Sequence, residues 1–234
     1  MANGTLRPAA ELARKESKPF PNESAEYRKA RTALLAEEIE LRRHLERVAE
    51  QRRALPLGGE VPQDYLFTGE NGKPVKLSEM FGTFDTLAIY FWMYGPERAR
   101  PCPMCTSIIG SLDVPSRDIT QKIAMAVVGR SPIERQLAFK QERGWHNLKF
   151  YATTDDAFPK DYRGLAPDGS EWPAYIVFKK VDGKVYMFWA GEMGGESLDP
   201  GQDPRGAPDL SALWNVLDTT PAGRDPEWYP KLEY

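Results

Sequence analysis

The sequence predicts an α/β fold in which a central mixed sheet is flanked by helices and preceded by a long N-terminal helix. Two runs, at 86–92 and 123–129, are apolar and rich in β-branched or aromatic residues, as strands covered on both faces are. Helical patterns at 103–117 and 131–143 alternate with these runs. A final pair of apolar runs, separated by an Asp-Gly turn, predicts an antiparallel hairpin that closes the sheet.

The N-terminal part is expected to be a lead-in followed by a helical arm. Residues 1–22 are polar and contain prolines, which predicts a flexible segment. A helix capped by Ser24 is expected over 24–55, because apolar residues recur every seven positions on a charged background. This helix either packs on the chain's own domain or forms an arm, so residues 24–55 are a candidate homodimer surface. The recurring residues are Tyr27, Leu34, Leu41, Val48 and Leu55.

A hairpin is expected next, at the start of the sheet domain. Asn71-Gly72 is a tight-turn dipeptide between apolar residues at 65–67 and 74–77. Ser78 is expected to cap the short helical turn that follows.

The second half of the domain is predicted from its own start and stop signals. Ser131, Pro132 and Glu134 have the pattern of a capping box at a helix start, and Gly144 is expected to end that helix. The remaining strands are expected at 148–152, 174–179 and 184–189, and Asp209 is expected to cap a final helix ending near Asp218.

These elements divide the chain into three expected parts. Residues 1–55 form the lead-in and arm, residues 56–218 the sheet domain, and residues 219–234 a tail with three prolines. Pro56 is expected to stop the arm helix.

The composition suits a globular protein and argues against some partners. Hydrophobic residues make up 41% and charged residues 28% of the chain. The net charge of −3 provides no basic field for nucleic acid or an anionic membrane. No apolar run approaches the roughly 20 residues of a spanning helix, and residues 1–20 lack the apolar core of a secretory signal. We therefore expect a cytoplasmic protein.

The chain's two cysteines, Cys102 and Cys105, follow a predicted buried strand and open a predicted helix. A helix N-terminus carries partial positive charge and free N–H groups, which stabilise a thiolate. Pro103 suits the first helical position, and Arg98 and Arg100 are candidates to add positive potential. Together these features are expected to lower the pKa of Cys102 from about 8.5 toward roughly 3.5–7.5. The second cysteine is expected to be the more buried one.

Redox chemistry, inert thiols and a metal site are the three interpretations of this pair. A Cys-x-x-Cys sequence after such a strand favours redox chemistry. Zinc usually takes four ligands, and the two histidines, His44 and His146, lie at spacings that do not complete a zinc site. We expect no metal or other cofactor, although Cu(I) held by two soft thiolates stays an alternative. His146 is either a proton carrier at the site or a surface residue near a helix end.

Pro173 is the other informative position, because it immediately precedes a predicted strand. An X–Pro bond there is either a cis bond in a tight turn or a trans bond at the first residue of a strand.

The run VKLSEMFGTFDTLAIYFWMYGPERARPCPMC, at 75–105, resembles the opening of the thioredoxin superfamily branch that holds peroxiredoxins and thioredoxin-like reductases. More closely, residues of about 54–225 are similar to a bacterial family of thioredoxin-like proteins known by a domain of unknown function. The shared motifs are Tyr94-Gly95-Pro96, Cys102-Pro103-Met104-Cys105, Phe139-Lys140 to Gly144-Trp145, and the run from Thr219 to Asp225 that includes Arg224.

The resemblance implies a thioredoxin-like fold and a set of site residues. It implies that Cys102 attacks a substrate sulfur and that Cys105 resolves the product. It also implies that Pro173 is a cis-proline facing the cysteines and that Trp172 flanks the substrate site. The chain departs from the peroxiredoxin pattern, which has threonine or serine three residues before its cysteine, because Ala99 stands there.

The sequence therefore predicts a thiol–disulfide oxidoreductase acting on a protein or small-molecule disulfide or thiol. The alternatives are a peroxiredoxin-like peroxide reductase and a non-enzymatic module that binds a partner, senses oxidation or holds Cu(I). Arg224 is either an anion-binding group near the site or a partner in a surface salt bridge.

Overall fold

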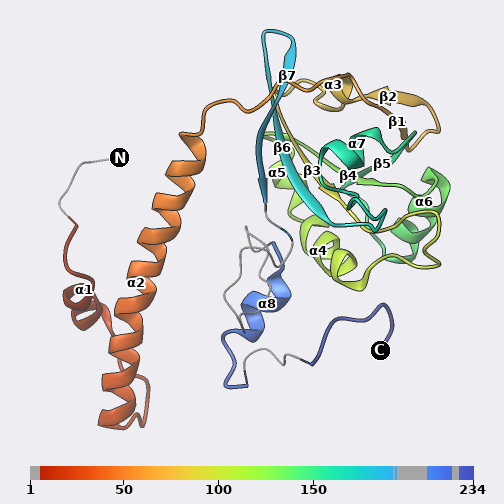
Figure 1. Ribbon diagram of the computed structural model, residues 1–234. Helices are drawn as coiled ribbons and strands as arrows, with labels where there is room; N and C mark the ends of the chain where they lie inside the picture. The colour runs from red at the N-terminus through yellow and green to blue at the C-terminus, as the bar shows by residue number, and fades with distance from the viewer. Residues whose placement is uncertain (1–5, 192, 194–209, 223–226) are drawn as a thin grey trace. The chain divides into compact units, whose positions relative to one another are not determined.

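The chain divides into two compact units, residues 1–56 and residues 57–234. Figure 1 shows the computed structural model of both units. Among the described residues, none of the helices is both long and apolar enough to cross a membrane. The structure describes residues 6–191, 193, 210–222 and 227–234.

The first unit is a pair of helices, α1 (Ala9–Glu16) and α2 (Ala25–Arg53). Ser24 caps α2 as predicted, because its Oγ accepts a hydrogen bond from the N–H of Tyr27 at 3.1 Å. The prediction of a flexible segment over 1–22 is wrong at α1. The reason is long-range packing, since the small side chains of α1 bury against Ile39 of α2, and the heptad leucines take no part in that cluster.

The second unit is built on a seven-stranded mixed sheet with the order β2-β1-β5-β4-β3-β6-β7. The central strands β3, β4 and β5 pair in parallel, and β6 and β7 form an antiparallel hairpin beside β3. A parallel β–α–β unit joined in one sheet to this hairpin, with helices on both faces, is a thioredoxin-like fold. The strands are β1 (Leu66–Gly69), β2 (Pro74–Lys76), β3 (Thr86–Phe91), β4 (Ala124–Gly129), β5 (Lys149–Thr153), β6 (Ala174–Val181) and β7 (Lys184–Gly191).

Helices cover both faces of this sheet (Figure 1). Alternate residues of β3 point to opposite faces, so Tyr90 packs in one core cluster with α4 and α6, and Ile89 packs in the other with α3 and α7. Both clusters are fully buried, which explains the continuous apolar run that predicted β3. The helices are α3 (Leu77–Met80), α4 (Pro103–Asp113), α5 (Ser116–Ile119), α6 (Ile133–Glu142), α7 (Ala157–Asp161) and α8 (Ala212–Leu217).

The turns confirm the two predicted hairpins. Gly72 has a φ of +72°, and its N–H bonds to the carbonyl of Gly69 at 2.9 Å. Asp182 and Gly183 have φ values of +49° and +79°, as a tight hairpin turn requires.

Several helix boundaries differ from the predicted ones. The helix expected over 103–117 is two helices, α4 and α5, with Pro115 between them, where it removes a backbone donor. Ser131 does not cap α6, because its hydroxyl donates to the carbonyl of Gly95 at 3.1 Å and Pro132 takes the cap position. Ser78 bonds to Asp64 instead of capping α3. The short helix α7 had no predicted counterpart, and the proposed cap residue Asp209 lies outside the described residues.

Candidate active site

The two cysteines lie where the chain, having left β3, enters α4. Cys102 is the N-cap residue of α4, and its N–H donates to the carbonyl of Met93 at 3.0 Å, which ties the helix start to the segment after β3. Pro103 occupies the first turn of the helix as the sequence predicted. Both sulfurs are free thiols, with Cys102 half-buried and Cys105 only 1% exposed.

The pKa of the Cys102 thiol is lowered to about 6. The largest cause is a hydrogen bond from the thiol of Cys105, which outweighs the opposing effect of burial. The backbone N–H groups of Cys105 and Met104 at the helix N-terminus and the positive charge of Arg98 lower it further. Cys102 is therefore a thiolate at neutral pH.

The neighbouring sulfur behaves in the opposite way. The hydrogen bond to Cys102 raises the pKa of Cys105 well above its ordinary value, and burial and the negative charge of Cys102 add to this effect. The pair thus holds one negative charge, and it resides on the sulfur nearer to solvent.

The two arginines that the sequence singled out lie in different surroundings. Arg98 donates from Nε to Glu171 Oε2 at 2.9 Å, and its charge acts on the Cys102 thiolate. Arg100 pairs instead with Glu142, and its guanidinium carbon lies 4.9 Å from the centre of the Phe139 ring. The structure therefore brings Arg98, but not Arg100, to the reactive sulfur.

Glu171 is a neighbour of the site that sequence reasoning missed. Its side chain is 8% exposed and also lies 3.7 Å from Arg130, which in turn bonds to Asp156 at 2.9 Å. Gly95 permits this close approach, because a Cβ at that position would collide with the Glu171 carboxylate. No local pattern marks Glu171, since it is 73 residues from Arg98.

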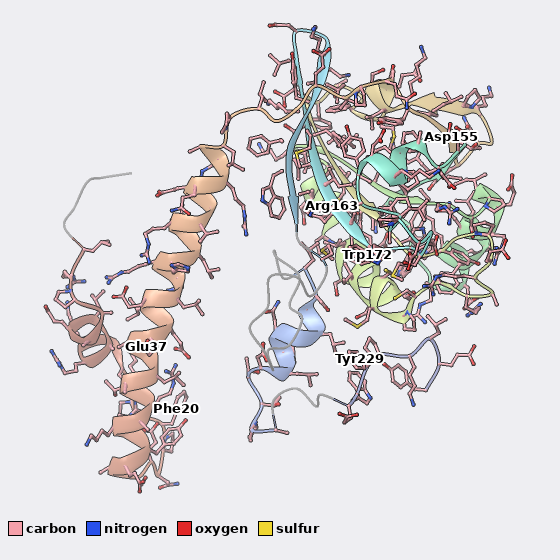
Figure 2. The ribbon with its side chains drawn as sticks, in the orientation of Figure 1. Phe20, Glu37, Asp155, Arg163, Trp172 and Tyr229 are labelled. Carbon is pink, nitrogen blue, oxygen red and sulfur yellow. The ribbon has the colours of Figure 1, made fainter. Side chains whose placement is uncertain are left out.

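Strand register brings Pro173 and Trp172 to the same end of the sheet as the dithiol. Ala174, the first residue of β6, pairs with Phe91, the last residue of β3, so Pro173 lies where the chain leaves β3 toward Cys102. Trp172 is 43% exposed (Figure 2). It lines a cavity of about 700 Å³ together with Pro173, and a second cavity of about 530 Å³ together with Arg98.

The family model described as "Bacterial protein of unknown function (DUF899)" matches residues 17–234. The chain belongs to this family. Curated proteins give no significant match to this DUF899 member.

Several solved structures of low sequence identity are similar to this DUF899 member. Peroxidoxin BcpB from Mycobacterium tuberculosis is 17% identical, with 56% of this chain and 82% of that chain covered and a TM-score of 0.42. A peroxiredoxin-like protein from Aquifex aeolicus is 13% identical, with 58% and 75% covered and a TM-score of 0.43. A secreted disulfide oxidoreductase from Mycobacterium tuberculosis is 18% identical, with 50% and 76% covered and a TM-score of 0.35. The fold assignment rests on the strand order and register of the chain itself.

Of the two remaining candidate residues, His146 does not lie at the dithiol. The backbone N–H of His146 donates to Asp113 Oδ2 at 3.1 Å, which places it at the opposite end of α4 from Cys102. Arg224 lies outside the described residues.

Within the described part of the chain, no three His, Cys, Asp or Glu side chains form a group that could hold a metal ion.

Proposed function

We propose that this DUF899 member is a thiol–disulfide oxidoreductase in which Cys102 attacks and Cys105 resolves. One observation carries the proposal. A half-buried thiolate at the N-terminus of an 11-residue helix lies beside a buried thiol one turn further on, and the two thiols have pKa values shifted in opposite directions. This asymmetry is what a nucleophile and its resolving partner require.

In the first step, the Cys102 thiolate attacks one sulfur of a substrate disulfide. A bond forms between Cys102 Sγ and that sulfur, the substrate S–S bond breaks, and the second substrate sulfur leaves as a thiolate. A nucleophile with a pKa of about 6 is mostly ionised at neutral pH while keeping part of its nucleophilicity.

In the second step, Cys105 Sγ attacks Cys102 Sγ and releases the bound half of the substrate. The proton of Cys105 passes to the departing substrate thiolate, directly or through solvent. The substrate disulfide has then gained two electrons from the protein and one proton from Cys105, the thiolate released in the first step takes its proton from solvent, and the protein holds a Cys102–Cys105 disulfide. A cellular dithiol or a reductase returns the protein to its reduced form.

The substrate is proposed to lie against Trp172 and Pro173, which lie at the same end of the sheet as the dithiol and together line a cavity of about 700 Å³. Protein disulfides and small-molecule disulfides both fit this proposal. We propose the cytoplasm as the compartment, because it keeps thiols reduced and the proposed reaction begins from the reduced pair.

The proposal is tested with glutathione disulfide as the probe and mass spectrometry of acid-quenched samples. The reduced wild-type protein is expected to form an internal disulfide. Cys105→Ser is expected to accumulate a glutathione adduct on Cys102, and Cys102→Ser to form none. An adduct on Cys105 in Cys102→Ser at the wild-type rate would contradict the assigned roles.

A parallel reaction with hydrogen peroxide distinguishes the proposed oxidoreductase from a peroxide reductase. The oxidoreductase proposal predicts that a small disulfide is reduced faster than peroxide under the same reductant. Faster consumption of peroxide would reverse the assignment and make the chain a peroxide reductase.

A further inference from the structure

Tyr90 places a hydroxyl group in the core directly behind the dithiol. The residue lies in β3, is 0% exposed and belongs to the same core cluster as Cys105. Its hydroxyl oxygen is buried and meets no hydrogen-bond partner of standard geometry among the described residues. A buried hydroxyl that makes no hydrogen bond of standard geometry is destabilising, so the presence of Tyr90 in this cluster requires an explanation.

The polar group beside this hydroxyl is the thiol of Cys105. Burial raises the pKa of Tyr90 well above its ordinary value, and the charge of Cys105 and a hydrogen bond to that sulfur raise it further. Tyr90 therefore keeps its proton at any working pH. It can donate a hydrogen bond to a sulfur anion, but it cannot act as a base.

The resolving step needs such a donor. Cys105 must carry negative charge as it attacks, although its surroundings favour the neutral thiol. The groups that act on its ionisation are the neighbouring Cys102, the backbone of Met93 and the hydroxyl of Tyr90, and the last two lower its pKa. Once Cys102 is bound in a mixed disulfide its charge is gone, which leaves the backbone of Met93 and the hydroxyl of Tyr90 as the groups that lower the pKa of Cys105.

We propose that Tyr90 serves the resolving step by donating a hydrogen bond from its hydroxyl to Cys105 Sγ as this sulfur attacks Cys102. This inference rests on the proposed function. The overall balance of the step is unchanged, because the proton of Cys105 still leaves with the substrate thiolate and Tyr90 retains its own. The Tyr90 hydroxyl is available as a donor because it makes no other hydrogen bond of standard geometry in the described core.

The test compares Tyr90→Phe with Tyr175→Phe. Each substitution removes one hydroxyl and keeps the ring, and the two residues pair across β3 and β6, so both variants change the same layer of the core. Tyr175 is a suitable control because burial alone raises its pKa, with no contribution from either cysteine. Tyr90→Phe removes a hydroxyl without a partner of standard geometry, and urea unfolding of both variants is the check that each retains the stability of the wild type.

The measurement is a single turnover with excess glutathione disulfide, quenched with acid at successive times over a series of pH values. Tyr90→Phe is expected to form the Cys102 adduct at the wild-type rate but to resolve it about 10-fold more slowly at neutral pH, as loss of a hydrogen bond to a charged group implies. The pH profile of its resolution rate is expected to move to higher pH. Tyr175→Phe is expected to match the wild type in both steps.

The outcomes separate this inference from the proposed function. Adduct formation with an unchanged resolution rate in Tyr90→Phe, or equal slowing in both variants, would overturn the role of Tyr90 and leave the oxidoreductase intact. Failure of the wild-type protein to form any adduct on Cys102 would overturn the function itself.

Discussion

The two ends of helix α4 each place an anion against backbone N–H groups, yet the two anions differ in availability. At the N-terminus, the Cys102 thiolate faces the N–H groups of Met104 and Cys105. At the C-terminus, the Asp113 carboxylate accepts hydrogen bonds from the backbone N–H groups of residues 146–148 at 3.1, 2.9 and 3.1 Å. The side-chain amide of Asn147 supplies a fourth bond to Asp113.

Both anions have a lowered pKa, so this property alone does not mark a reactive group. Burial would raise the pKa of Asp113, but the N–H donors of residues 146–148 outweigh it. Its oxygens are all engaged and it is 4% exposed, so it fixes the loop before β5. Cys102 is half-buried, so its sulfur stays accessible to solvent although it faces the N–H groups of the helix start. The two ends of α4 therefore differ in access to the lone pairs of the anion. We call the N-terminal end at Cys102 the chemical end and the C-terminal end at Asp113 the structural end.

The largest effect is expected at the structural end. Asp113→Ala leaves three backbone N–H groups without their acceptor, of which that of Leu148 is buried, and should lower the free energy of unfolding by about 2–3 kcal/mol. The control Asp118→Ala removes an exposed carboxylate from the neighbouring helix α5 and should change it by about 0.5 kcal/mol or less. Urea unfolding measures both. A loss below about 1 kcal/mol for Asp113→Ala would show that the loop does not depend on this carboxylate.

A second effect is expected in the dependence of stability on pH. The folded reduced protein holds Cys102 as a thiolate above a pKa of about 6, whereas the unfolded chain keeps it protonated up to its ordinary value of 9.0. Unfolding therefore takes up a proton in this range, so the stabilisation is complete above the unfolded pKa and is lost as the pH falls through the folded one.

The comparison with Cys102→Ser isolates this contribution. The difference in unfolding free energy between the reduced wild type and Cys102→Ser is expected to grow as the pH rises from about 6 to about 9. Urea titrations under a non-thiol reductant measure it. A difference that is constant over this range would mean that the thiolate is not stabilised by the fold.

A smaller effect is expected on the pKa of Cys102 when the thiol of Cys105, its main hydrogen-bond donor, is removed. Cys105→Ala deletes the largest cause of the lowered pKa and should shift the pH profile of Cys102 alkylation to higher pH. Cys105→Ser retains an O–H donor at the same place and should shift it less. Identical profiles in the two variants would assign the low pKa to the helix N-terminus instead.

Local signals made much of the chemical end predictable from the sequence. The continuous apolar run predicted β3, and Pro103 after Cys102 predicted the start of α4, because both depend on neighbours along the chain. The contacts at the structural end were harder to predict from the sequence. Asp113 meets residues 146–148 more than 30 positions away in sequence, and no periodic pattern encodes that contact.

The tertiary partners of the dithiol were unpredictable for the same reason. Tyr90 read as one more apolar strand residue, and only the packing of α4 on β3 sets its hydroxyl beside Cys105. Arg98 and Arg100 are two positions apart and are equivalent by sequence. In the structure Arg98 pairs with Glu171, whereas Arg100 pairs with Glu142. These glutamates, which are distant in sequence, determine which of the two arginine side chains lies near Cys102 Sγ.

These two arginines give the smallest effect and the finest comparison. Arg98→Ala removes a positive charge that lowers the pKa of Cys102, so the pH profile of alkylation should move slightly to higher pH. Arg100→Ala removes the same unit of charge from a residue paired with Glu142 and should leave the profile in place. Because the Arg98 side chain is 38% exposed, salt should weaken its effect, and the difference between the variants should shrink at high ionic strength. Equal shifts in both variants would mean that net charge, and not the placement of Arg98 by Glu171, acts on the thiolate.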